Sequence, residues 1–279
     1  LITSSAASDV YKRQENDDLV TETEEKPLEI FKPNEKGFFP LLGESFKFFL
    51  LHLPAIATIV VPVFLVVEFL VPLLSVLIPD FAEGLTGVGA VDDSFSWLIR
   101  ELILALIAAV IGGIAWIATI RVIASSIRGE KIPPVQAMKD GTAMLPMFVI
   151  TAILYYSVVI VGSVLLIVPG VIAGIYFIFW QFSYVLRGKG AVSALIYSTD
   201  LVRGNFVRVF LNVIGISIVM FILNEFVINL IAGNIASLIG EEDSFSYKII
   251  NAIFTALGKV FEGVRIIFML SLFKNLEKS

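Results

Sequence analysis

The chain has 279 residues, of which 57% are hydrophobic and only 16% are charged, and its mean hydropathy is +0.91. Soluble domains contain about 45–50% apolar and about 25% charged residues, so this composition excludes an ordinary soluble protein. The sequence contains no cysteine, which excludes disulfides, thiolate metal ligands and a cysteine nucleophile. The formal charge is −5, and no basic patch is interleaved with aromatic residues, so no nucleic-acid partner is expected.

Residues 1–35 are predicted to form a disordered tail that precedes a membrane domain at residues 36–279. Residues 4–14, SSAASDVYKRQ, resemble the in-frame translation of a transposase sequencing adapter, and we expect them not to belong to the natural protein. The acidic residues 15–35 contain few large apolar side chains and cannot bury a core. The natural N-terminus is therefore not defined by this sequence, and the presence of an upstream domain is left open.

Several apolar stretches exceed the roughly 20 residues that a helix needs to cross a bilayer. We predict an all-α polytopic membrane protein with six transmembrane helices, arranged as three hairpins. The spans are expected at about residues 53–78, 97–124, 145–168, 169–186, 206–231 and 247–273. Pro54, Pro62 and Pro72 lie inside the first span and are expected to kink or interrupt it.

Each predicted hairpin follows a segment that begins near a lysine, at Lys36, Lys131 or Lys189. We expect these segments to be amphipathic helices in the cytoplasmic interface of the membrane. The connections after the second and fourth spans carry lysine and arginine, whereas residues 79–96 and 232–246 carry neither. By the positive-inside rule, both termini of this multi-pass protein are then cytoplasmic.

Five charged residues lie well inside the predicted spans, more than five residues from either end, and each would cost about 2.5–3.5 kcal/mol at the centre of a bilayer if it faced lipid. They are Glu68, Glu225, Lys259, Glu262 and Arg265. We expect them to form a cluster that joins spans one, five and six, with Lys259, Glu262 and Arg265 sharing one helix face at i, i+3 spacing. Buried ion pairs, a proton or solute path and contacts with lipid headgroups are three interpretations of this cluster.

Pro169-Gly170 is predicted to reverse the chain between spans three and four, because proline stops a helix and glycine allows a turn. The order LIVPG, an aromatic span and then ALIYSTDLVRGNFVRVF resembles the membrane domain often fused to glycerophosphodiester phosphodiesterases. It is also similar to the YciC-like family of bacterial inner-membrane proteins. The matching positions are Pro169, Gly170, Ala194, Ser198, Leu201, Gly204, Phe206 and Arg208. The RGKG turn and the C-terminal FKNLEKS depart from the pattern of that family.

No catalytic, cofactor-binding or metal-binding residue is predicted, and the single histidine, His52, is expected to be an interfacial anchor. The first functional hypothesis is a non-enzymatic accessory or scaffold module, with a role in envelope or lipid homeostasis implied by the resemblance alone. A small-solute or lipid transporter is the alternative, favoured if the intramembrane charges line an aqueous cavity. A third is the membrane half of a lipid phosphodiesterase. Membrane lipids, together with a membrane-protein partner or a second copy of the chain, are the expected partners.

Overall fold

The computed structural model describes residues 37–77, 93–225, 230–239 and 244–277. The predicted tail at residues 1–35, with the adapter-like residues 4–14, lies outside the described residues. Ten α-helices lie within the described ranges. They are α2 (Phe38–Leu77), α4 (Asp93–Ile127), α5 (Pro134–Leu165), α6 (Ile167–Tyr176), α7 (Trp180–Arg187), α8 (Ala191–Val202), α9 (Phe206–Ile222), α10 (Leu230–Ile239), α11 (Phe245–Val260) and α12 (Glu262–Glu277).

The predicted all-α fold is confirmed for these residues, which contain no strand. Five helices are long and apolar enough to cross a membrane, at Phe38–Ser75, Ile99–Ile127, Pro134–Leu165, Ile167–Arg187 and Phe206–Ala232. Large apolar side chains cover the outer faces of these helices, with Val164 81% and Ile167 76% exposed. In water such a surface would be strongly unfavourable, whereas hydrocarbon tails solvate it without cost.

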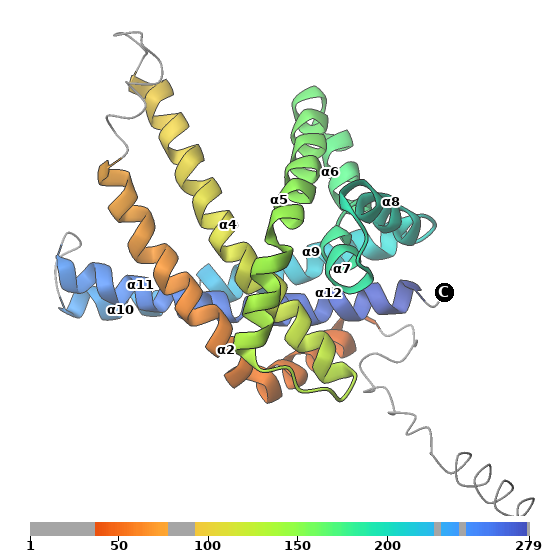
Figure 1. The fold of residues 1–279 in the computed structure, drawn as a ribbon, viewed down its shortest axis with the longest axis horizontal. Helices are drawn as coiled ribbons and strands as arrows, with labels where there is room; N and C mark the ends of the chain where they lie inside the picture. Colours follow the sequence, from red (N-terminus) through yellow and green to blue (C-terminus); the bar gives the residue numbers. More distant parts are fainter. Residues whose placement is uncertain (1–36, 78–92, 226–229, 240–243, 278–279) are drawn as a thin grey trace, which may run out of the picture.

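The first two interfacial segments are not separate helices. Residues 38–49 are the beginning of α2, which continues through Pro54, Pro62 and Pro72 without a break. Residues 134–144 similarly begin α5, with Pro146 inside the same helix. Buried hydrophobic side chains lie on both sides of Pro54 and Pro62, and their packing holds α2 together where each proline removes one main-chain hydrogen bond. The ribbon of α2 bends rather than stops (Figure 1).

The turn between α5 and α6 is made by Leu166, not by Pro169-Gly170. Leu166 is extended, with φ −158° and ψ 133°, and α6 begins at the next residue. Pro169 then falls in the first turn of α6, where its missing N–H has no intrahelical acceptor anyway. Gly170 serves close packing: a Cβ atom there would lie 2.7 Å from Cα of Ser163 on α5.

Two predicted spans are broken helices. Span four consists of α6 and α7, separated by residues 177–179. Span six consists of α11 and α12, separated by Phe261, and each helix has 16 residues. In Figure 1, α11 and α12 lie nearly end to end, α10 runs beside α11, and α2 crosses them. Most of α12 is buried, so it forms the centre of the helix assembly.

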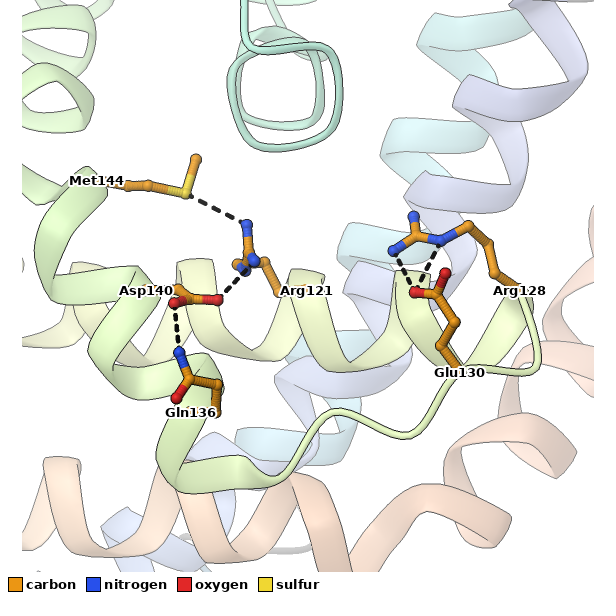
Figure 2. A network of polar contacts seen from close by, with 6 residues as sticks. All are labelled: Arg121, Arg128, Glu130, Gln136, Asp140 and Met144. Carbon is orange, nitrogen blue, oxygen red and sulfur yellow. Dashed lines mark hydrogen bonds and ion pairs between the residues drawn. The ribbon is translucent and has the colours of Figure 1, made fainter.

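An ion pair joins the end of α4 to the beginning of α5. Arg121 donates to Asp140 over 2.5 Å, and the other carboxylate oxygen of Asp140 accepts from Gln136 over 2.8 Å (Figure 2). Beyond it, Arg128 and Glu130 bond to each other across the turn at Gly129, whose φ is 75°. These contacts stabilise the basic loop between α4 and α5.

Candidate functional site

A cavity of about 680 Å³ lies among α2, α4, α5, α7, α9, α11 and α12. A smaller cavity of about 160 Å³ adjoins it, since Phe64, Trp116, Lys259, Arg265 and Ile266 line both. The larger cavity also receives Glu68 from α2, and the smaller one receives Glu262 from α12. Four of the five charged residues singled out from the sequence therefore meet at these two cavities.

Arg265 is the most constrained of the four charges. Its Nε donates to Glu262 over 2.6 Å, and its guanidinium lies 4.9 Å from the centre of the Trp116 ring. Trp116 in turn donates its indole N–H to Gln181 over 2.6 Å. A cation held against an aromatic face and paired with a carboxylate is stabilised within apolar surroundings. The orientation of Arg265 is thus set by residues from α4, α7 and α12.

Lys259 is held less tightly. It lies in the last turn of α11, and its ammonium is 6.0 Å from the centre of the Phe64 ring. Glu68, one turn after Phe64 on α2, interacts with Lys259 electrostatically. The break at Phe261 separates Lys259 from Glu262, so the three charges of span six do not share one continuous helix face. Lys259 at the end of α11 and Glu262 at the start of α12 each complement the dipole of their own helix.

Glu225 does not join this group. It follows α9, its side chain is exposed, and it lines neither cavity. The expected cluster of spans one, five and six is therefore replaced by one of α2, α11 and α12, to which α4 and α7 add Trp116 and Gln181. The sequence could not predict this grouping. Counting residues gives the depth of a side chain along a span, but it does not give the direction in which that side chain points once the helix is broken.

The break between α6 and α7 borders the larger cavity through Ile178, Trp180 and Gln181. Ser198 of α8 satisfies the main chain there: its Oγ accepts from the N–H of Phe179 over 3.0 Å and donates to the carbonyl of Tyr176 over 2.8 Å. Irregular backbone at membrane depth persists only where it is packed in protein or lines a cavity. Both conditions hold here.

The other motif positions shape the surroundings of this break. Ala194 is fully buried on α8, and Leu201 packs against the main core. Gly204 has φ +86°, which favours glycine at the turn into α9. Phe206 stacks on Phe210 and contacts Tyr176 at the end of α6. Arg208 is half-buried, and its carbonyl accepts from Asn212. With Pro169 and Gly170 on α6, these residues form a structural motif around span four.

A second polar group was not predicted from the sequence. Arg187 of α7 binds both carboxylate oxygens of Glu277 over 2.6 and 2.7 Å, and Tyr197 of α8 and Lys274 of α12 donate to the same carboxylate. Burial opposes the charge of Glu277, but these hydrogen bonds outweigh it and lower the pKa of the carboxyl. The pKa of Tyr197 is raised by burial and by its bond to Glu277. Only the i, i+3 spacing of Lys274 and Glu277 was visible in the sequence.

Within the described ranges, no group of three or more histidine, aspartate or glutamate side chains could hold a metal ion. His52 stacks on Phe48, at 4.1 Å between ring centres, and the Nδ1 atom of His52 lies 2.9 Å from the carbonyl oxygen of Phe48.

The described residues form an all-helical protein with five helices long and apolar enough to cross a membrane, which is compatible with a membrane-embedded protein. Residues 90–276 match DUF7847, a domain of unknown function. The chain therefore belongs to the DUF7847 family, and the matched region contains Lys259, Glu262, Arg265 and the whole motif around span four. No curated protein and no solved structure matches the chain.

Proposed function

We propose that this protein is a membrane transporter that binds a lipid or small solute in the larger cavity. The observation that carries the proposal is that Glu68, Lys259 and Arg265, from three different helices, line one cavity of about 680 Å³. Ligand pockets commonly have volumes of about 300–1,000 Å³ and combine apolar walls with a few polar groups. If the helices only packed against one another without water, the ion pair would have a role, but a cavity of this size would not.

The broken helices support the same proposal. Many transporters bind their substrates where spans are interrupted near the middle of the bilayer, because unwound backbone and helix ends offer polar groups there. Here α6–α7 and α11–α12 are both interrupted beside the cavity. In this proposal α11 and α12 together form a sixth, discontinuous span, and both termini lie on the cytoplasmic side of a bacterial inner membrane.

A non-enzymatic accessory or scaffold role is the second candidate. The observation that favours it is the Arg265–Glu262 ion pair, which is already formed without a ligand and would fix the packing of α12 against α4. The resemblance to the YciC-like family, and the role in envelope or lipid homeostasis that it implies, are compatible with both candidates. The two candidates differ in whether water and solutes enter the cavity.

Cysteine labelling separates the two candidates, because the chain has no native cysteine. Ala152 of α5 lines the larger cavity, whereas its neighbour Ile153 is 53% exposed on the outer, apolar surface. A maleimide reacts with the thiolate, which needs water. We expect Ala152→Cys to react with a membrane-impermeant maleimide in proteoliposomes, while Ile153→Cys stays unlabelled. Protection of both positions would reject an aqueous cavity and favour the scaffold role.

A further inference from the structure

The charges around the two cavities are balanced. Two cations, Lys259 and Arg265, face two carboxylates, Glu68 and Glu262, so the lining has no net charge. Arg265 uses its Nε for Glu262, and in the described part of the chain its terminal nitrogens have no hydrogen-bond partner. Lys259 forms no salt bridge to the described residues, and its amine is exposed toward the cavities. Cationic donors therefore remain for a ligand where the cavities meet.

One carboxylate remains for a ligand. Glu68 lines the larger cavity but not the smaller one, and Glu262, which lines the smaller, is occupied by Arg265. The larger cavity thus has a carboxylate on α2 and cationic groups on α11 and α12. Tyr155, Tyr156 and Trp116 line the same space, and their ring faces attract cations.

A third polar group near the junction also lacks a partner. Thr119 of α4 lines the smaller cavity, is 1% exposed, and its Oγ1 forms no hydrogen bond with the described residues. Several other hydroxyls of the described helices donate to a carbonyl of their own helix, as Thr151 does over 2.8 Å. A buried hydroxyl without a partner is costly, and a ligand acceptor beside Lys259 and Arg265 would remove that cost.

Apart from Gln181 and Ser217, the remaining wall of the larger cavity is apolar. Phe148, Ala152, Val213, Ile216 and Met269 supply it from α5, α9 and α12. A ligand that fills this cavity needs hydrocarbon as well as charges, because unfilled apolar space beside a bound ion gains nothing from the hydrophobic effect.

We propose that the ligand is a zwitterionic phospholipid, which carries a phosphate and an ammonium on the same headgroup. The phosphate binds between Lys259, Arg265 and the hydroxyl of Thr119, the ammonium lies toward Glu68, and the acyl chains cover the apolar wall. A headgroup with no net charge matches a lining with no net charge, whereas an anionic lipid such as phosphatidylglycerol has no ammonium to place beside Glu68. This inference rests on the transporter proposed above and names its substrate class.

The test measures lipid binding to the purified full chain in detergent by isothermal titration calorimetry. The ligands are short-chain phosphatidylethanolamine, short-chain phosphatidylglycerol and free phosphoethanolamine. We expect phosphatidylethanolamine to bind at least about tenfold more tightly than phosphatidylglycerol, a difference that corresponds to about 1.4 kcal/mol. Free phosphoethanolamine should bind more weakly than the lipid, because it leaves the apolar wall uncovered.

Two variants and two matched controls assign the headgroup contacts. Lys259→Met should weaken both lipids by about tenfold or more, since it removes a cation from a desolvated contact. Glu68→Gln should weaken phosphatidylethanolamine alone and so abolish the preference. Lys248→Met on the same helix as Lys259, and Glu225→Gln at the intramembrane carboxylate outside the cavities, should bind as the parent does. Size-exclusion profiles check that each variant is folded.

Equal affinity for the two lipids would overturn the inference, and so would a loss of both lipids in Glu68→Gln. Free phosphoethanolamine that binds as tightly as the lipid would overturn the assignment to a lipid. These results are independent of the labelling at Ala152: labelling without a lipid preference rejects the zwitterionic ligand only, whereas protection at Ala152 rejects the transporter itself.

Discussion

The N–H of Phe179 donates to the Oγ atom of Ser198 over 3.0 Å, from the break in span four to a helix 19 residues further along the chain. The same hydroxyl donates to the carbonyl of Tyr176 over 2.8 Å. One side chain thus satisfies a donor and an acceptor that an unbroken helix would have satisfied itself. Because the break borders the cavity, Ser198 supports the walls of the candidate site without facing the ligand.

Replacing Ser198 by alanine should therefore destabilise the protein more than an ordinary serine substitution does. It leaves a main-chain donor and acceptor without their partner, at a cost of about 1–3 kcal/mol. The measurement is the thermal midpoint of the purified protein in detergent. Ser193→Ala on the same helix is the control, because Ser193 is exposed and its hydroxyl bonds only to the Gly190 carbonyl. Equal shifts in the two variants would contradict a supporting role for Ser198.

Ser198 also illustrates how far sequence reasoning extends. Its place in a family-like motif was evident from the residues around it, but its function depends on a break at residues 177–179 that no proline or glycine marks. The break occurs within FIFW, a run of large apolar residues typical of a continuous span. Tertiary packing of Phe179 and Trp180, both nearly fully buried, decides the local backbone instead.

The apolar spans were predictable because hydropathy alone determines which segments must avoid water. The positions of the turns and the grouping of charges were less so. Pro169-Gly170 is a strong turn signal, yet Leu166 makes the turn and Gly170 packs against Ser163. Glu225 has the same cost in lipid as Glu68, yet only Glu68 reaches the cavity. Both outcomes depend on contacts between helices, which spacing along one helix does not encode.

Gly170→Ala should disrupt the α5–α6 hairpin. The added Cβ would clash with Oγ of Ser163 and lie 2.7 Å from its Cα and its main-chain nitrogen, so the two helices would have to separate. Overpacking of this kind typically costs about 1–3 kcal/mol. Gly174→Ala, one turn later on α6, is the matched control, because the nearest atom to its Cβ would be Oη of Tyr155 at 3.8 Å. Thermal unfolding of both variants checks this, and an unchanged midpoint in Gly170→Ala would rule out the close approach.

Stability should fall in acid partly through Glu277. Although burial opposes its charge, the bonds from Arg187, Tyr197 and Lys274 lower its pKa in the folded state below the ordinary value of 4.5. A group with a lowered folded-state pKa contributes stability above its unfolded pKa and loses it as the pH falls through the folded value. Glu277→Gln should therefore unfold at a lower temperature than the parent at pH 7, with the difference shrinking below pH 4.5.

The control for that pH series is Glu130→Gln. Glu130 pairs with Arg128 at the surface, with both side chains more than half exposed, whereas the side chain of Glu277 is 6% exposed. An exposed pair contributes about 0–1 kcal/mol, so this variant should follow the parent at every pH. A constant difference between Glu277→Gln and the parent across the whole pH range would exclude titration of Glu277 as the cause.

The six-span topology predicts that Lys189 and Ser246 lie on opposite sides of the membrane. Lys189 follows α7 in the basic connection, and Ser246 lies near the start of α11 after a segment without lysine or arginine; both side chains are exposed. Since the parent contains no cysteine, each single-cysteine variant reports one position without background. In intact spheroplasts, Ser246→Cys should react with an impermeant maleimide, while Lys189→Cys should react only after lysis. Reaction of both in intact spheroplasts would mean that span five does not cross the bilayer, and α11–α12 would then lose its place as the sixth span.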